Sequence, residues 1–329
     1  MSEETIQRVS VLADHAEYLI ATAARAPSVH NTQPWRFRVG KYAVELYADP
    51  ARKLRVDPVG REMLISCGAA LFGLRLAVRS LGYQPVVDLL PVPKRLRLLA
   101  VVRLGAAQPM TARERQLLEA LPHRHTHRGP WDPGPLPAGL AAGIQHDALA
   151  EGAELVIVDR ALSYQKLADI VGATTRRQDL DPLAREEILR WTRGAADPAY
   201  DGVPAHAFPA GADRQPGQLP QRDFDQGRGL GLLPAGGAPP AATAVLVTSG
   251  DGRADWLRAG QALHRLLAHA ASKWVFASLY TQPLEAAAIR GLIQDRLDLP
   301  GHPQILLQLG LAHNTPVTAR RSPDTLLEP

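Results

Sequence analysis

Cysteine and lysine are scarce in this 329-residue chain, and a long apolar run is missing. Cys67 is the single cysteine, which excludes an internal disulfide. No apolar run approaches the roughly 20 residues of a membrane-spanning helix. Met1 is followed by Ser2-Glu3-Glu4 rather than by a basic and apolar signal. We therefore expect a soluble, cytoplasmic protein without a membrane partner.

The basic residues are almost all arginines, since only five of the 37 are lysines. The formal net charge is +4 and the pI about 9.4, values that raise the question of nucleic-acid binding. However, the arginines are spread along the chain among acidic residues and form no long basic run. We therefore expect no nucleic-acid partner. The planar guanidinium group is instead well suited to bidentate recognition of phosphate.

Two common catalytic signatures are also missing. The chain has no G-x-S-x-G turn that would present a nucleophilic serine. No G-x-G-x-x-G follows a predicted strand, and the glycine-rich stretch 227–231 lies in an irregular region. Cys67 falls in an apolar helical pattern, where a core thiol is the default interpretation. Nucleophilic catalysis and a Rossmann dinucleotide site are therefore disfavoured.

The rest of the composition is typical of a globular protein with helices and strands. Hydrophobic residues make up 46% and charged residues 21% of the chain. Apolar residues recur at helical spacing in 57–81 and 255–272, which we expect to be core helices. Further helices are predicted at 113–121, 140–149, 164–176, 183–191 and from Pro283 onward, and strands at 44–47, 86–90, 98–104, 154–158, 244–248 and 304–310.

A faint repeat divides this pattern into two. Gly68-Ala69-Ala70-Leu71 lies in one long helix and Gly260-Gln261-Ala262-Leu263 in the other, and a short apolar strand follows each helix later. A polar tract at 123–128, ended by Gly129-Pro130, separates the two regions. We therefore predict an α+β protein of two related halves that pack pseudo-symmetrically, residues 1–121 and residues 122–329.

Residues 195–240 interrupt the second half. The segment is crowded with glycine, proline and polar residues, and its few large apolar residues show no period. Structureless loops of this length are usually either functional or disordered. We favour a lid, because Val203, Phe208, Phe224 and Leu230 could anchor it, and a disordered insertion is the alternative.

The most distinctive stretch runs from Arg25 to Phe37 and is dense in hydrogen-bonding side chains. Pro27 ends a helical pattern, and Phe37 begins an extended run. Ser28, Asn31 and Gln33 should therefore lie on a stiff connection with their polar ends free. Such a loop can fix a polar, planar ligand, and an ordinary Asx or Ser turn is the alternative.

A second candidate is the polar tract itself. Arg124, Thr126 and Arg128 alternate, so an extended backbone would place two guanidinium groups and a hydroxyl on one side as a phosphate clamp. A solvated basic turn is the alternative. The histidines at 123, 125 and 127 would point to the other side, but the interleaved cations disfavour a metal ion, and we expect none.

These stretches resemble the motifs of a known family. The segment 27–35 is similar to the P-S-x-x-N-x-Q-P-W motif of the FMN-dependent nitroreductase superfamily. Several others resemble the Acg-like branch of this superfamily, which consists of fused, two-half proteins. They are Asp57-Pro58-x-Gly60-Arg61-Glu62, Ile65-Ser66-Cys67-Gly68-Ala69-Ala70-Leu71, Arg124-His125-Thr126-x-Arg128, the segment 256–263, Gln282-Pro283-x-Glu285 and Pro303-Gln304-x-Leu306-Leu307. The resemblance runs nearly end to end.

The resemblance implies a nitroreductase-like fold in which the two fused halves form an intrachain pseudo-dimer, each with a mainly antiparallel sheet and helices around it. One FMN site between the halves would be complete and the other degenerate. A turn at Ser278–Gln282 would lie beside flavin N5, and Arg320 and Arg321 would be the C-terminal basic pair at the phosphate. The residues implied to bind FMN are Ser28, Asn31, Gln33, Arg124, Thr126, Arg128, Ser278, Tyr280, Gln282, Arg320 and Arg321.

The activity implied by the resemblance is two-electron reduction of a nitroaromatic compound or a quinone by NAD(P)H through flavin N5. The alternative is an FMN-sequestering protein with a lid over the flavin and little or no turnover. FMN is the implied cofactor, and NAD(P)H and a small aromatic acceptor are the implied partners. A monomer would be competent, and a homodimer is compatible with the same fold.

Overall fold

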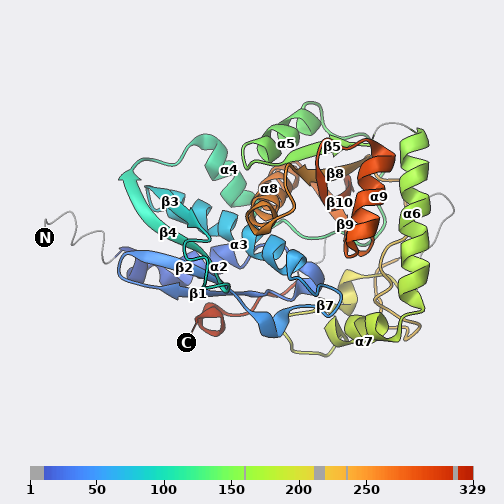
Figure 1. The fold of residues 1–329 in the computed structure, drawn as a ribbon, viewed down its shortest axis with the longest axis horizontal. Helices are drawn as coiled ribbons and strands as arrows, with labels where there is room; N and C mark the ends of the chain where they lie inside the picture. The colour runs from blue at the N-terminus through green and yellow to red at the C-terminus, as the bar shows by residue number, and fades with distance from the viewer. Residues whose placement is uncertain (1–10, 159–160, 211–218, 235, 314–317, 329) are drawn as a thin grey trace, which may run out of the picture.

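Two four-stranded sheets lie on either side of a central pair of long helices (Figure 1). This computed structural model describes residues 11–158, 161–210, 219–234, 236–313 and 318–328. The elements of the first sheet and its surroundings are α2 (Ala16–Ala23), β1 (Trp35–Val39), β2 (Ala43–Ala48), α3 (Arg61–Ser80), β3 (Tyr83–Leu89), β4 (Leu98–Ala107) and α4 (Ala112–Ala120), with the short 3₁₀ helices η1 (Val29–Asn31) and η2 (Pro50–Arg52).

The second sheet follows in the chain. Its elements and those around it are α5 (Leu140–Leu149), β5 (Glu154–Ile157), α6 (Ala161–Asp179), α7 (Pro182–Trp191), β8 (Ala242–Thr248), α8 (Arg253–Ala271), β9 (Val275–Tyr280), α9 (Ala287–Leu297) and β10 (His302–Leu311), with the 3₁₀ helix η4 (Gln282–Leu284). A two-stranded parallel pair, β6 (Thr192–Arg193) and β7 (Val203–Pro204), precedes the 3₁₀ helix η3 (Ala205–Ala207).

The two sheets have the same topology. The strand order is β1-β2-β4-β3 in one and β5-β8-β10-β9 in the other, and all their pairings are antiparallel. Each long helix follows the second strand of its sheet, α3 after β2 and α8 after β8. The predicted α+β fold of two pseudo-symmetric halves is therefore confirmed. The chain position at which one half ends and the other begins stays a prediction.

The two glycines of the repeat lie where α3 and α8 cross. A methyl group added to Gly68 would lie 2.2 Å from the carbonyl oxygen of Leu257, and one added to Gly260 would lie 1.9 Å from that of Ile65. Glycine is required here because the helix backbones approach too closely for any side chain. Within the described residues, α3 is the one helix long and apolar enough to span a membrane. However, 83% of its most apolar 18-residue stretch is buried inside the fold, as in the core helix of a globular protein.

The structure corrects the prediction for residues 278–285. Ser278 to Tyr280 form the end of strand β9, not a turn, and α9 begins at Ala287 rather than at Pro283. β9 pairs with β10 from Leu306 opposite Tyr280 to Leu311 opposite Val275. Five of its six residues are buried, so the strand shows no alternation of apolar and polar positions by which it could be recognised.

The segment 195–240 contains only η3 and β7 as regular structure among its described residues, and 211–218 and 235 lie outside them. The four proposed anchors do pack together: Val203, Phe208 and Phe224 are buried in one cluster with Ile188 of α7, and Leu230 packs against it. The described part of the segment therefore has a small core of its own.

The last described residues return to the first sheet (Figure 1). Leu327 forms a parallel bridge with Phe37 of β1, and the backbone N–H of Glu328 donates to the Phe37 carbonyl at 2.7 Å. Leu326 is fully buried in the core of the first sheet. This C-terminal segment, residues 318–328, thus joins the end of the chain to its beginning.

Candidate functional site

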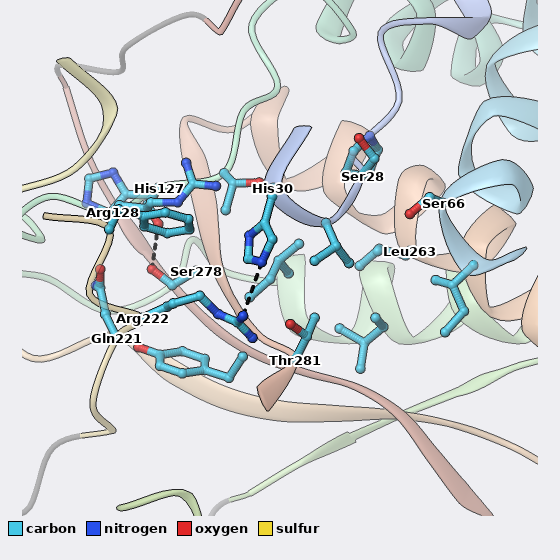
Figure 2. Close-up of a pocket in the computed structure, with 18 residues that line it drawn as sticks. Ser28, His30, Ser66, His127, Arg128, Gln221, Arg222, Leu263, Ser278 and Thr281 are labelled. Carbon is cyan, nitrogen blue, oxygen red and sulfur yellow. Dashed lines mark hydrogen bonds between the residues drawn. The ribbon is translucent and has the colours of Figure 1, made fainter. Parts of the chain in front are cut away.

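A pocket of about 720 Å³, counted with its open mouth, lies where elements of both sheets meet the 195–240 segment. Figure 2 shows Ser28 and Ser66 at one end of the pocket, and Arg128, Ser278 and Gln221 at the other. The lining residues are 27–30, 65–66, 126–128, 221–222, 224, 263, 278–281 and 305.

The loop 27–33 contributes Ser28 and His30 to this pocket in an unusual backbone conformation. His30, Asn31 and Gln33 have φ values of 50°, 55° and 49°, in the left-handed region that non-glycine residues rarely adopt. The Ser28 hydroxyl accepts a hydrogen bond from the Gln33 backbone N–H at 3.0 Å. Each such residue costs on the order of 1–3 kcal/mol, so surrounding contacts must hold the loop in place.

Asn31 and Gln33 provide those contacts, and the expectation that their polar ends are free is wrong. The Asn31 amide donates to the carbonyls of Gly202 and Ala319, both at 3.1 Å. The Gln33 amide donates to the Tyr200 carbonyl at 2.7 Å, and its oxygen accepts from the backbone N–H of Arg321 at 2.9 Å. Both side chains are buried outside the pocket lining, where they tie the loop to the 195–240 segment and the C-terminal segment.

The predicted separation of the tract 124–128 into an arginine side and a histidine side is not observed, because His127 lines the pocket beside Thr126 and Arg128 while Arg124 does not. Thr126 bridges to Ala277 of β9, and Thr126 and Arg128 line the pocket. The His125 ring packs on Phe276, with ring centroids 4.2 Å apart. The described residues contain no group of three or more His, Cys, Asp or Glu side chains able to hold a metal ion.

Arg124 lies behind the pocket, almost fully buried. Its Nη2 donates to the Arg25 carbonyl at 3.0 Å, while Nε and Nη1 find no hydrogen-bond partner in the described part of the chain. Burial first, and then repulsion from Arg320 and Arg25, lower the pKa of Arg124 to about 9. Arg128 is only partly buried as a residue, but its Nη1 is buried without a hydrogen-bond partner among the described residues, and desolvation followed by repulsion from Arg222 lowers its pKa to about 10.

The C-terminal pair of arginines is split. Arg320 joins the cation cluster: it donates to the carbonyls of Ala24 and Ala26, and burial, Arg25 and Arg128 lower its pKa to about 10. Arg321 instead lies near Arg36, Arg52, Asp49 and Asp201, and donates to the Thr325 carbonyl at 2.6 Å. We define the arginine cluster as Arg25, Arg124, Arg128 and Arg320.

Strand β9 forms the wall beside the tract 124–128. The Ser278 hydroxyl donates to the His127 carbonyl at 2.8 Å, and the Tyr280 hydroxyl donates to the Gln308 amide oxygen at 2.6 Å. Both side chains line the pocket. Gln282 is buried but does not line it, and the adjacent Thr281 does.

Three residues that close the pocket, His30, Arg222 and Phe224, were not among the predicted site residues. Arg222 donates to His30 Nε2 at 3.1 Å and to a carboxylate oxygen of Glu285 at 2.6 Å, and Figure 2 shows Arg222 and His30 pointing toward each other. Burial, Arg222 and Arg128 hold the pKa of His30 well below its usual range, so the ring is neutral and accepts this bond. The Phe224 ring meets the edge of His30, with centroids 5.4 Å apart. Glu285 belongs to a recognised motif, but nothing near Arg222 in the sequence indicated its position.

The geometry thus defines a protein of two fused α+β halves with a pocket between them and, behind one wall of this pocket, buried cationic donors without a hydrogen-bond partner among the described residues. Such a site suits a ligand with a planar polar part and an anionic group.

Comparison with known proteins identifies the family. The chain is 34% identical over 323 residues, 95% of its length and 89% of the relative's, to "Putative NAD(P)H nitroreductase Rv3131" of Mycobacterium tuberculosis. It is 28% identical over 319 residues, 95% of both chains, to "Putative NAD(P)H nitroreductase acg" of the same organism. No family model matches the chain. On the strength of the first relationship, the chain belongs to this nitroreductase family.

Solved structures show a weaker likeness. A nitroreductase with bound FMN from Desulfitobacterium hafniense matches with a TM-score of 0.40 and 13% identity, over 64% of this chain and 95% of that one. A nitroreductase described as putative, from Anabaena variabilis, matches with a TM-score of 0.43 and 13% identity, over 82% of this chain and 69% of that one. At this similarity they add nothing to the family assignment.

Proposed function

We propose that the chain is an FMN-dependent oxidoreductase that oxidises NAD(P)H and reduces a nitroaromatic compound or a quinone by two electrons. The observation that carries the proposal is that the arginine cluster holds three buried guanidinium nitrogens without a hydrogen-bond partner among the described residues, two on Arg124 and one on Arg128. Each unpartnered buried donor costs about 1–3 kcal/mol or more. The phosphate of FMN would offset this cost, and the names of the mycobacterial relatives support the redox activity.

The roles of individual residues follow from the same proposal. Arg124 and Arg320 would hold the phosphate, with Arg25 beside them. Ser28, Thr126, Arg128, Ser278 and Tyr280 would line the cofactor, while Asn31, Gln33, Gln282 and Arg321 would support these walls from behind. When bound, FMN would supply a ring that accepts a hydride at N5 and passes two electrons on.

The residues over the pocket would exclude water and position the acceptor. Neutral His30 and Arg222 offer a flat, polar surface, and Phe224 adds an aromatic edge. Opening of the Arg222–Glu285 ion pair would let the reductant and the acceptor enter in turn.

The test is a spectrum followed by a titration. Protein purified with added FMN should show a visible flavin band, release flavin on denaturation, and bleach rapidly when NADPH is added anaerobically. Protein with no flavin band and no released flavin would overturn the proposal.

A second candidate function, sequestration of FMN without turnover, is favoured by the buried ion pair between Arg222 and Glu285. The Arg222 and Glu285 side chains are 10% and 7% exposed, and their contact fastens the 195–240 segment, our proposed lid, over the pocket. Flavin-loaded wild type that does not bleach would support this function, provided that Arg222→Ala bleaches. Arg103→Ala, at an exposed ion pair on β4, is the matched control. Rapid bleaching of the wild type would exclude sequestration.

A further inference from the structure

A second, smaller cavity adjoins the main pocket at the start of α3. It has room for about one water molecule. Val29 and Ser66 line both cavities, so these two residues lie between the two spaces. The other lining residues of the small cavity are Thr32, Pro34, Arg52, Leu54, Asp57, Glu62 and Met63.

Glu62 is the unusual member of this lining. Its side chain is 4% exposed, and neither carboxyl oxygen has a hydrogen-bond partner among the described residues. The nearest cation is Arg61, whose Nη1 lies 3.8 Å from Glu62 Oε1, too far for a hydrogen bond. A buried carboxylate without donors is costly, and protonation removes the charge.

The charged groups that face Glu62 come from five parts of the chain. Asp57 lies in the loop before α3, Arg61 is on α3, Glu285 follows η4, and Arg222 belongs to the 195–240 segment, while Arg52 lines the same cavity. Burial first, and then Glu285 and Asp57, raise the pKa of Glu62 well above its usual range against the opposing effect of Arg61 and Arg222. Glu62 therefore keeps its proton at pH values where an ordinary glutamate has lost it.

Ser66 connects this acid to the main pocket. It lies one helical turn after Glu62, on the same face of α3. Its hydroxyl donates to the backbone carbonyl oxygen of Glu62 at 2.8 Å, and Figure 2 shows Ser66 at the pocket end near Ser28. The Glu62 carboxyl group is not bonded to this hydroxyl, but both residues line the small cavity, where one water molecule would bridge them. A hydroxyl both donates and accepts, so rotation of the Ser66 hydroxyl would pass a proton from that water to the main pocket.

We propose that Glu62 is a proton source for the main pocket and that Ser66 relays the proton. The inference rests on the proposed function, because reduction of a quinone by NAD(P)H consumes one proton beyond the hydride. The hydride brings two electrons and one proton to the quinone. The second proton moves from Ser66 into the pocket, Ser66 takes a proton from the bridging water in the small cavity, and that water takes the proton of Glu62. The products are NAD(P)⁺, the hydroquinone and a Glu62 carboxylate facing Arg61, which solvent protonates again.

The first test needs no flavin. A carboxyl group whose pKa is raised in the folded state stabilises least at high pH, so wild-type stability falls as pH rises through and above the ordinary carboxyl range. Glu62→Gln removes this loss. The ratio of the two unfolding constants, from denaturant titrations, should grow by up to roughly tenfold per pH unit in that window. The control Glu119→Gln, at an exposed position of α4, should leave the wild-type profile unchanged. Parallel profiles for wild type and Glu62→Gln would overturn the proposal.

The second test uses the flavin-loaded protein in single-turnover reduction of a quinone. Glu62→Gln and Ser66→Ala should each slow this step by roughly 10²-fold, the low end of general-acid effects. Their FMN affinity should stay within about twofold of wild type, and the double variant should be no slower than Glu62→Gln, as expected of residues that act as a unit. Unchanged rates in Glu62→Gln would refute the relay alone, whereas wild type that binds no flavin would overturn the relay and the proposed function together.

Discussion

Replacement of Arg124 tests the arginine cluster most directly. Its Nε and Nη1 have no partner in the described part of the chain, so both are available to an anion. A hydrogen bond to a charged group contributes about 1.5–3 kcal/mol. Two such bonds to a phosphate therefore amount to roughly 3–6 kcal/mol, and Arg124→Ala should weaken FMN binding by roughly 10²- to 10⁴-fold. Arg124→Lys should recover only part of this loss, because an ammonium group lacks the guanidinium fork.

Arg320 should behave differently, since it already donates to the carbonyls of Ala24 and Ala26. Its replacement removes positive charge and also loosens the loop, so part of its effect should extend to ligands without a phosphate. The double variant Arg124→Ala/Arg320→Ala should still lose far more affinity for FMN than for riboflavin.

The assay is quenching of flavin fluorescence on titration with protein, carried out in parallel for FMN and riboflavin. The ratio of the two affinities isolates the phosphate from the ring. Arg115→Ala, at an exposed position of α4, should leave both affinities unchanged. Equal losses for the two flavins in Arg124→Ala would refute the assignment of this residue to the phosphate.

Two further predictions concern stability. Gly260→Ala places a methyl group 1.9 Å from the Ile65 carbonyl oxygen and should destabilise the fold by about 3 kcal/mol or more. The control Gly291→Ala on α9, where a methyl group meets nothing within 4 Å, should be neutral or slightly stabilising. Equal thermal midpoints for the two variants would contradict the close helix crossing. Burial, Arg124 and Arg320 lower the pKa of His264 to about 3. The contribution of neutral His264 to stability is therefore complete above its ordinary pKa of about 6.5 and is lost as pH falls toward 3, and His264→Gln should flatten the dependence of the unfolding free energy on pH by up to ~1.4 kcal/mol per pH unit. An unchanged slope in denaturant titrations at several pH values would count against a neutral His264.

Local patterns predicted most of the regular structure. The apolar spacing of the two long helices and the repeated glycines indicated a pseudo-symmetric core, and the crossing at Gly68 and Gly260 is that core. Strand β9 was missed because it is buried on both faces and because Ser278 and Gln282 suggested a turn. Alternation of apolar and polar residues identifies a strand that is buried on one face only. A strand covered on both faces shows no alternation and cannot be recognised in this way.

The site was predicted less completely, for a different reason. The types of residue at 28 and 124–128 indicated chemistry, and these residues do lie at or behind one pocket. The partners of Asn31 and Gln33, however, come from residues 200–202 and 319–321, and no local pattern records contacts over such separations. The same holds for Arg222, which reaches His30 across 192 positions. The proposed assignment of each residue to FMN awaits the binding experiments above.

The C-terminal segment has a consequence for the order of events during synthesis. Arg320 and the bridge from Leu327 to Phe37 complete the walls around the first loop, although that loop leaves the ribosome almost 300 residues earlier. The loop backbone, with its left-handed residues, must therefore wait in an incomplete environment until the final strand and tail are made. The complete arginine cluster exists only after Arg320 has been made. Binding of the cofactor would therefore follow translation. A shortage of the cofactor would leave a folded chain whose arginine cluster holds no anion, and synthesis of the chain would not be interrupted.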